Sequence, residues 1–263
     1  MMNKHSIIVE NLSLGYSGSS NGAGEIFPPF SLTADSSQLI ALVGRNGAGK
    51  STFLRTLAGL QNIFSGKIYI NNKSVEKLSR KEYADNVSFV STETVRVMHL
   101  KVFDLVALGR YAYTNLLGNL SISDEKIILE SLKMVGMSNF IWRNVSELSD
   151  GERQRVMIAR ALVQDTPIML FDEPTAFLDI PNKYEIILLL GSLAREKSKT
   201  IIFATHDLNI ALQIADKIWF MTNGKMHDGT PAQLLQTNTF DEMFADTTLK
   251  LENGEIRLTV SVK

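Results

Sequence analysis

The sequence predicts an α/β fold with a mixed, mainly parallel core sheet and an inserted α-helical subdomain. Apolar runs typical of strands alternate with helical patterns after residue 150, as expected for a parallel sheet covered by helices on both faces. One strand-like run, residues 38–43, leads directly into a glycine-rich turn. Between residues 91 and 147 helical patterns dominate and strand signals are sparse. We therefore expect a core of residues 1–90 and 151–230, a helical subdomain at 91–150 and an extension at 231–263.

Composition and charge narrow the class of protein. Of the 263 residues, 44% are apolar and 21% are charged, which is ordinary globular material. The formal net charge of -1 argues against a general nucleic-acid or anionic-membrane binder. There is no cysteine, so thiolate and disulfide chemistry are excluded. We find no apolar signal core near the N-terminus and no apolar run approaching the ~20 residues that cross a bilayer.

The first part of the chain reads as strands around one helix. The expected strands are Ile7–Val9, Gln38–Val43, the hairpin Lys67–Ile70 with Lys73–Val75, and Val87–Val90. The Gly/Ser-rich segment Gly15–Glu25 predicts a surface loop. Helical spacing follows from Thr52 to Ala58, and Gly59 is a plausible helix stop.

In the rest of the chain, predicted helices and strands alternate. The expected elements are helices at Val102–Arg110, Ser123–Val135 and Gly151–Gln164, a strand ending at Asp172, a helix opened by Pro181, strands at Thr200–Ala204 and Lys217–Thr222, and a helix between those two strands. After Pro231 we expect two short helices and a hairpin turning at Asn253-Gly254.

The turn after residue 43 matches G-x-x-x-x-G-K-[ST] between a predicted strand and a predicted helix, the context that distinguishes a phosphate-binding loop from an ordinary glycine turn. Its glycines let backbone N–H groups approach a phosphate, and the helix N-terminus adds partial positive charge. Lys50 is expected to neutralise the β- and γ-phosphates, and Ser51 to offer a hydroxyl to Mg²⁺. The predicted ATP-binding residues of this loop are Gly44, Arg45, Asn46, Gly47, Ala48, Gly49, Lys50, Ser51 and Thr52.

Two further patterns carry complementary chemistry. The buried-strand run from Ile168 ends in Asp172 and Glu173; we expect the first to hold Mg²⁺ and the second to polarise an attacking water as general base. Ser149-x-x-Glu152 is a capping box that opens an amphipathic helix. A capped helix N-terminus is itself an anion site, so the capping and functional interpretations are compatible.

Together these segments resemble the ATP-binding-cassette (ABC) ATPases, which are P-loop NTPases. Gly44–Thr52, Leu148–Glu152 and Ile168–Glu173 are similar to the Walker A, signature and Walker B motifs, in the family's order. Phe177–Asp179 resembles the D-loop, and Thr205–Asp207 the segment of the switch histidine. The resemblance spans roughly Ile7 to Gly229.

The resemblance implies residue roles and a dimer. It gives catalytic roles to Glu173 and His206, a D-loop role to Asp179 and adenine stacking to Tyr16, although an aromatic residue at a strand end is often only core. Two copies would pair head-to-tail around two ATP molecules with Mg²⁺. The residues expected to bind the ATP of the partner subunit are Ser149, Asp150, Gly151 and Glu152.

Three positions depart from the family pattern. The signature usually has glycine at position 150 and glutamine at position 152, where this chain has Asp150 and Glu152. Thr92 occupies the place of the Q-loop glutamine and is too short to reach Mg²⁺ in the same way. We expect the adjacent Glu93 to take over that metal contact.

The segment from Val102 to Thr114 resembles cassettes that serve importers of iron-siderophore complexes, haem and cobalamin. This implies docking on integral-membrane permease subunits at the cytoplasmic face of the membrane, with no direct cargo contact and no nucleic-acid partner. The side chains expected to line a docking groove or to be subdomain core are Val95, Val97, Met98, Leu100 and Phe103. Alternatives are an importer ATPase for another cargo, a soluble cassette ATPase acting on ribosomes or DNA, and a small-molecule kinase.

Overall fold

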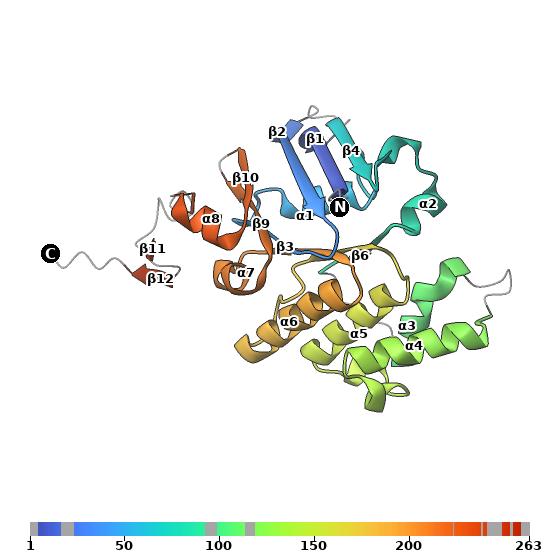
Figure 1. Cartoon of the computed structure of the whole chain (residues 1–263). Coiled ribbons are helices and arrows are strands. Elements are labelled where there is room, and N and C mark those ends of the chain that lie inside the picture. Colours follow the sequence, from blue (N-terminus) through green and yellow to red (C-terminus); the bar gives the residue numbers. More distant parts are fainter. Residues whose placement is uncertain are drawn as a thin grey trace.

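The structure is a computed structural model that describes residues 5–16, 24–92, 99–113, 119–222, 224–237, 239–240, 249–252 and 255–258. Its centre is a six-stranded sheet with helices on one face and a second, antiparallel sheet on the other (Figure 1). The strands of the central sheet, in spatial order, are β10 (Lys225–Gly229), β9 (Lys217–Thr222), β3 (Leu39–Gly44), β8 (Thr200–Thr205), β7 (Ile168–Asp172) and β6 (Val87–Val90). All neighbours pair in parallel except β10 with β9, so the predicted mixed, mainly parallel core sheet is confirmed.

Alternating residues of the central strands face two separate cores. In β3, Leu39, Ala41 and Val43 pack with the helices, whereas Ile40 and Leu42 pack with the antiparallel sheet. Because both faces of the sheet are covered, β3, β7, β8 and β9 are apolar at most positions, and the sequence reads there as nearly unbroken apolar runs. This burial fixes the strand register and so fixes where each strand ends.

The antiparallel sheet was only partly predicted. Its strands are, in order, β2 (Gly24–Asp35), β1 (His5–Tyr16), β4 (Ser65–Ile70) and β5 (Lys73–Ser74). The prediction of one loop from Gly15 to Glu25 was wrong at both ends, because β1 continues to Tyr16 and β2 begins at Gly24. Pro28 and Pro29 hid β2 in the sequence. They are tolerated because β2 lies at the edge of its sheet.

Most helices cover one face of the central sheet, and α1 lies on the other face together with the antiparallel sheet. The α-helices of the first half are α1 (Lys50–Leu57), α2 (Arg80–Ala84), α3 (Val102–Ala107) and α4 (Ile122–Met134). Those of the second half are α5 (Asp150–Leu162), α6 (Ile180–Glu196), α7 (Leu208–Ile214) and α8 (Pro231–Gln236). Helices α3 to α6 lie together below the sheet in Figure 1, whereas α1 packs on the opposite face.

Most predicted helices are confirmed, with one change. The helix expected to reach Arg110 ends as α-helix at Ala107 and continues as a 3-10 helix, Leu108–Tyr113. Gly109 lies so close to α5 that a Cβ atom there would clash with the carbonyl of Arg160. In the tail, α8 and the predicted hairpin, β11 (Leu249–Glu252) with β12 (Glu255–Leu258), are confirmed, while the second short helix would lie among residues outside the described ones. None of the described helices is long and apolar enough to cross a bilayer.

Candidate functional site

The predicted phosphate loop is the turn between β3 and α1. Gly47 and Gly49 have φ angles of 82° and 105°, a left-handed backbone that other residues adopt only with strain. Gly49 precedes α1 without a side-chain cap, so the first N–H groups of α1 are not claimed by a capping side chain. The turn therefore presents backbone donors and a helix N-terminus at one point, which suits an anion.

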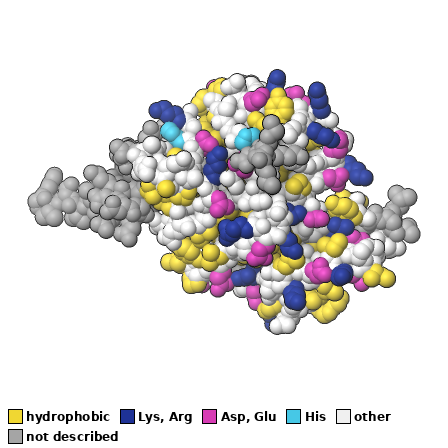
Figure 2. Space-filling model, viewed as in Figure 1, with side chains coloured by type: hydrophobic (Ala, Val, Ile, Leu, Met, Phe, Trp, Pro, Cys, Tyr) yellow, Lys and Arg dark blue, Asp and Glu magenta, His cyan; other side chains and the backbone are white. Residues whose placement is uncertain are grey.

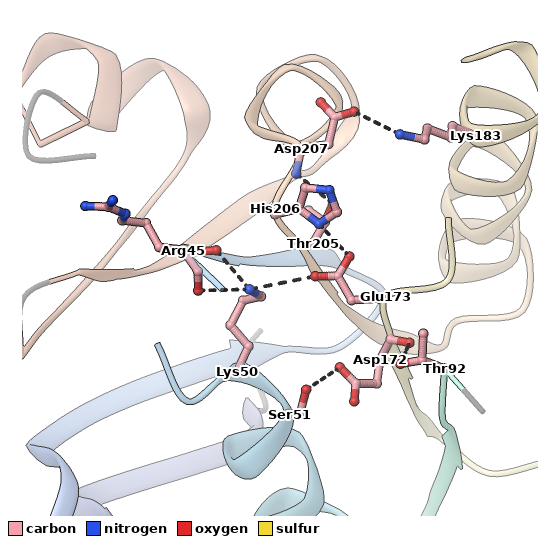
Figure 3. A network of polar contacts seen from close by, with 11 residues as sticks. Arg45, Lys50, Ser51, Thr92, Asp172, Glu173, Lys183, Thr205, His206 and Asp207 are labelled. Atoms are coloured by element: carbon pink, nitrogen blue, oxygen red, sulfur yellow. Dashed lines mark hydrogen bonds and ion pairs between the residues drawn. The ribbon is translucent and has the colours of Figure 1, made fainter. Parts of the chain in front are cut away.

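Lys50, the first residue of α1, points back over this turn. Its Nζ donates to the carbonyl oxygens of Gly44 at 2.8 Å and Arg45 at 3.3 Å, and it lies 3.7 Å from Oε1 of Glu173 (Figure 3). The residue is only 6% exposed. Burial lowers the pKa of Lys50, while the carboxylates of Glu173 and Asp172 act in the opposite direction.

Ser51 and Asp172 bring a hydroxyl and a carboxylate together from α1 and the end of β7. The Ser51 hydroxyl donates to Oδ1 of Asp172 over 2.9 Å. Thr92 follows β6, and its hydroxyl donates to the backbone carbonyl of Asp172 at 3.1 Å. Thr92 thus stabilises the backbone at the end of β7, next to the Asp172 carboxylate. Glu93, the predicted metal contact, lies outside the described residues.

Glu173 occupies the centre of the network. One carboxylate oxygen faces Lys50, and Oε2 lies 3.0 Å from Nδ1 of His206, which follows β8 (Figure 3). The φ of Glu173 is 50°, an unusual value for a residue with a side chain, of the kind that concentrates at functional sites. The parallel strands β3, β7 and β8 all end at this edge, which is why residues more than 100 positions apart in sequence meet there.

Asp207 and Lys183 extend the network away from the phosphate loop. Asp207 caps α7 by accepting from the N–H of Ile210 at 3.3 Å. Its second oxygen lies 3.9 Å from Nζ of Lys183 on α6. These contacts hold the chain that follows His206. The sequence analysis did not predict Lys183, because nothing in its local pattern sets it apart.

The predicted signature forms the N-terminus of α5. Ser149 and Glu152 make a full capping box: the Ser149 amide and hydroxyl donate to Oε2 of Glu152 at 2.8 and 2.9 Å, and the Glu152 amide donates back at 3.3 Å. These hydrogen bonds from Ser149 hold the pKa of Glu152 below its usual range. Asp150 is paired with Arg153 at 2.8 Å, so one of the two extra carboxylates is neutralised locally.

Asp179, the predicted D-loop residue, lies beside this helix end. Asp179 caps α6 by accepting from the backbone and side-chain amides of Asn182 at 3.1 and 2.6 Å. A Cβ atom at Gly151 would come within 3.2 Å of the Asn182 side chain, so glycine permits this close packing. The predicted signature and the predicted D-loop are thus adjacent parts of one surface.

Tyr16 is the last residue of β1 and is 56% exposed, so it is not a core residue. Its hydroxyl lies 3.4 Å from that of Thr52 in the phosphate loop. The structure therefore brings an exposed aromatic ring next to the loop, as a nucleotide base would require.

A cavity of about 680 Å³ lies between the core and the 3-10 helix Leu108–Tyr113. It is also lined by the end of α1 and by Tyr83 and Phe89. Of the side chains expected to line a docking groove or to be subdomain core, Leu100 and Phe103 pack against the core, and Val95, Val97 and Met98 lie outside the described residues. The exposed aromatic residues Tyr111 and Tyr113 also line this cavity.

Comparison with known proteins gives the family. Residues 27–176 match the ABC transporter family model. An ABC transporter ATP-binding protein from Methanocaldococcus jannaschii is 39% identical over 89% of this chain and 80% of its own length. The iron(3+)-hydroxamate import ATP-binding protein FhuC of Bacillus subtilis is 32% identical over 91% of this chain and 88% of its own.

Similar solved structures also belong to ABC transporters. A metal-chelate type ABC transporter in an inward-facing conformation matches with a TM-score of 0.80 and 25% identity, over 96% of this chain and 95% of the other. The dimeric cassette MJ0796, a bacterial ABC transporter cassette, matches with a TM-score of 0.74 and 28% identity, over 86% of this chain and 98% of the other. This chain belongs to the ABC transporter family, as an ATP-binding, ATP-hydrolysing cassette subunit.

Proposed function

We propose that this chain powers an importer of metal chelates, such as iron-siderophore complexes, haem or cobalamin, by hydrolysing Mg-ATP between two of its copies. One observation carries the catalytic part of the proposal. The Glu173 carboxylate lies between Lys50 and His206, next to the Ser51–Asp172 pair, at the edge where the parallel strands end.

In the proposed complex, the loop from Gly44 to Thr52 holds the phosphates. Its backbone N–H groups surround the β-phosphate, and Lys50 exchanges its carbonyl partners for phosphate oxygens. Tyr16 stacks on the adenine. Because Lys50 is already buried and aimed over the turn, little side-chain ordering remains to be done on binding.

The hydroxyl of Ser51 and the carboxylate of Asp172 fit Mg²⁺, which prefers oxygen ligands and usually keeps waters and substrate phosphates in its shell. No group of three acidic or histidine side chains able to hold a metal occurs among the described residues, which suits an ion completed by the nucleotide. When bound, Mg²⁺ would neutralise charge developing on the β- and γ-phosphates. That Glu93 also contacts the metal stays a prediction.

The proposed chemistry is an in-line attack by water on the γ-phosphorus. Glu173 accepts a proton from the water as the water oxygen bonds to the γ-phosphorus. The bond between the γ-phosphorus and the β–γ bridging oxygen breaks, which leaves ADP. His206 leaves Glu173 and donates to the γ-phosphate, and the Thr92–Asp172 hydrogen bond holds the metal ligand in place. The nucleotide thus replaces contacts that Glu173 makes with Lys50 and His206.

The proposed site is completed by a second copy. In a head-to-tail pair, Ser149, Asp150, Gly151 and Glu152 of one copy face the γ-phosphate bound by the other, and Asp179 lies between the two sites. The dimeric cassette structure among the solved relatives supports this arrangement. Hydrolysis would remove the γ-phosphate contacts that hold the pair together.

We further propose that the cavity beside Leu108–Tyr113 receives a short helix of the membrane permease, on the cytoplasmic face of the membrane. In this division residues 1–90 and 151–230 bind ATP, residues 91–150 carry the signature and residues 231–263 form an extension. Cargo would touch only the permease side. Positive and negative side chains are interspersed on the face seen in Figure 2, which does not favour a nucleic-acid partner. The Bacillus subtilis relative FhuC is an import ATP-binding protein, which supports transport over action on ribosomes or DNA.

Replacing the general base tests the catalytic proposal. We expect Glu173→Gln to bind Mg-ATP but to lose roughly 10²–10⁴-fold in turnover, because the amide cannot accept the proton of the water. Turnover is measured as phosphate release and binding as a thermal shift. Glu125→Gln, on the exposed side of α4, is the control and should leave turnover unchanged. Near wild-type turnover in Glu173→Gln would overturn the assignment.

A further inference from the structure

Arg110 is a buried charge at the junction of three helical elements. The residue is 8% exposed and belongs to the 3-10 helix Leu108–Tyr113. Its Nε donates to Oδ1 of Asp124 on α4 at 2.8 Å, and Nη2 lies 2.8 Å from the same oxygen. Its Nη1 donates to the backbone carbonyl of Val163, the C-cap residue of α5, at 2.9 Å. One guanidinium group therefore joins the 3-10 helix to α4 and to α5, which pack against each other (Figure 1).

The same short segment holds the C-terminal end of α5 at two further points. The guanidinium of Arg110 lies over the ring of Tyr113, 3.8 Å from its centroid, and the Tyr113 hydroxyl donates to the carbonyl of Gln164 at 3.0 Å. Gly109 lies against the carbonyl of Arg160, where a side chain would not fit. The last carbonyls of a helix have no partner within it, so these contacts cap α5 from outside. A positive charge at this end also suits the helix dipole.

Stability alone does not account for the buried pair of Arg110 and Asp124. Taking two charges out of water costs free energy that their attraction does not always recover, and a well-packed apolar pair is often as stable. An apolar pair would fill the space but could not fix the end of α5 by directional hydrogen bonds. The planar guanidinium has several donors in a fixed geometry, so Arg110 sets the position of α5 relative to α4.

The other end of α5 carries the predicted signature. The helix runs unbroken over 13 residues and is capped at its start by Ser149. A shift or tilt of its C-terminal end is therefore passed along a regular helix to Ser149. Nearer the signature, Arg155 pairs with Glu185 on α6, but the Glu185 side chain is 59% exposed, and exposed ion pairs contribute little. The buried contacts at the far end are thus the firmer hold on this helix.

We infer that Arg110 is a positioning residue for ATP hydrolysis, which acts through α5 by holding Ser149 where the γ-phosphate of the second copy's ATP would arrive. This inference rests on the proposed function. Arg110 lies at the end of α5 away from the signature, so its loss should lower turnover without weakening nucleotide binding by the phosphate loop. Ser121 bonds to Oδ2 of Asp124, so the contact of Arg110 with Oδ1 does not depend on Ser121.

Arg110→Lys tests this inference. Lysine keeps a positive charge near Asp124 but lacks the forked donors that bond to Asp124 and Val163 together. We expect turnover, measured as phosphate release, to fall at least fivefold, while the dissociation constant for ADP, which needs only one copy, stays unchanged. Tyr113→Phe removes only the bond to Gln164 and should lower turnover about twofold.

Ile68→Val is the control for stability. Ile68 is fully buried in β4 of the antiparallel sheet, so its truncation lowers the thermal unfolding midpoint without touching α5. Turnover of Ile68→Val, measured well below that midpoint, should equal that of the wild type. A fivefold loss in this variant as well would place the effect of Arg110→Lys in general stability and overturn the inference.

A double-mutant cycle with Ser149→Ala keeps the remaining outcomes separate. If Arg110 acts through the signature, Arg110→Lys should lower turnover fivefold when Ser149 is present and less than twofold in Ser149→Ala. Equal losses in the two backgrounds, or no loss in the first, would overturn the inference, while a loss caused by Ser149→Ala alone would still support the proposed function. Wild-type turnover in Ser149→Ala would contradict the proposed function, and the inference with it.

Discussion

The phosphate-loop region and the signature region are organised in opposite ways. Around the phosphate loop, contacts join residues that are distant in sequence: Ser51 to Asp172, Lys50 to Glu173, and His206 to Glu173. At the signature, Ser149 bonds to Glu152, and Asp150 pairs with Arg153, all within one helical turn. The first region is set by the sheet, and the second by a single helix end.

This difference bears on how a shared site would assemble. Long-range contacts between packed elements hold a buried site in shape before ligand arrives, so the phosphate-loop region is preorganised within one copy. The signature region is partly exposed and satisfies its own polar groups. The exposed N-terminus of α5 can therefore bind a phosphate that another molecule carries. The proposed pair requires this, because the ATP is held by the phosphate loop of the second copy.

The largest effect is expected from breaking the preorganised region at Lys50. Lys50→Ala removes the buried ammonium that faces Glu173, and without it the carboxylates Asp172 and Glu173 repel the triphosphate. We expect the affinity for Mg-ATP to fall at least 100-fold. A concentration of one hundred times the wild-type dissociation constant, which stabilises the wild type by ~2.7 kcal/mol, should then give almost no thermal shift.

Lys126→Ala is the matched control for Lys50→Ala. Lys126 is an exposed lysine on α4 that pairs with Glu130 at 3.9 Å, so its loss should leave nucleotide affinity unchanged. An undiminished thermal shift in Lys50→Ala would mean that the phosphate lies elsewhere.

A smaller effect, confined to the paired state, is expected at Ser149. Ser149→Ala removes the cap of α5 and should cost ~1 kcal/mol of the free energy of unfolding. The affinity of the monomer for ATP should not change, whereas turnover should fall at least tenfold because the hydroxyl that would face the γ-phosphate is lost.

Ser121→Ala separates capping from function. Ser121 caps α4 through the same kind of box, with Asp124 in place of Glu152. Its replacement should cost a similar free energy of unfolding and leave turnover unaltered. Equal turnover losses in the two serine variants would show that the effect at Ser149 is only one of helix stability.

The sequence predicted the preorganised region more completely than the exposed one. A phosphate loop needs a strand before it and a helix after it, and local signals predicted both β3 and α1, which flank the turn that ends in Lys50 and Ser51. A capping box is not specific, since Ser79, Ser121, Ser149 and Thr230 all begin helices in this way. Only position in the fold distinguishes Ser149.

Other features depend on contacts that no local pattern encodes. The edge strand β2 was hidden by Pro28 and Pro29, because a proline forbids a central strand but not an edge strand. The hydrogen bond from Thr92 to the Asp172 carbonyl, and the exposure of Phe177, follow from tertiary packing. Thr92, which stands where the family has glutamine, thus has a structural role, although its side chain is too short to reach Mg²⁺ as a glutamine would.

The smallest effect is expected from removing the charge of one carboxylate in the signature region, that of Glu152. Glu152→Gln keeps an acceptor for Ser149 but removes a negative charge from the end of α5 that would face phosphate. We expect the ATP-dependent dimer of the Glu173→Gln background to tighten two- to fivefold, an effect that shrinks with added salt. Glu82→Gln is the control, because Glu82 makes the same box with Ser79 on α2, outside the site.

Measuring the thermal stability of these two variants at decreasing pH isolates the contribution of the capping carboxylates to stability. Hydrogen bonds from Ser149 and Ser79 lower the pKa of Glu152 and of Glu82 below the usual 4.5. A lowered folded-state pKa stabilises the protein above the unfolded-state pKa, and this contribution is lost as the pH falls through the folded-state value. Both glutamine variants should therefore unfold at lower temperature than the wild type near pH 7, and this difference should shrink as the pH falls below 4.5 and through the lowered folded-state pKa. Only Glu152→Gln should also change dimerisation, and a matching change in Glu82→Gln would place the cause in global charge and not in the signature.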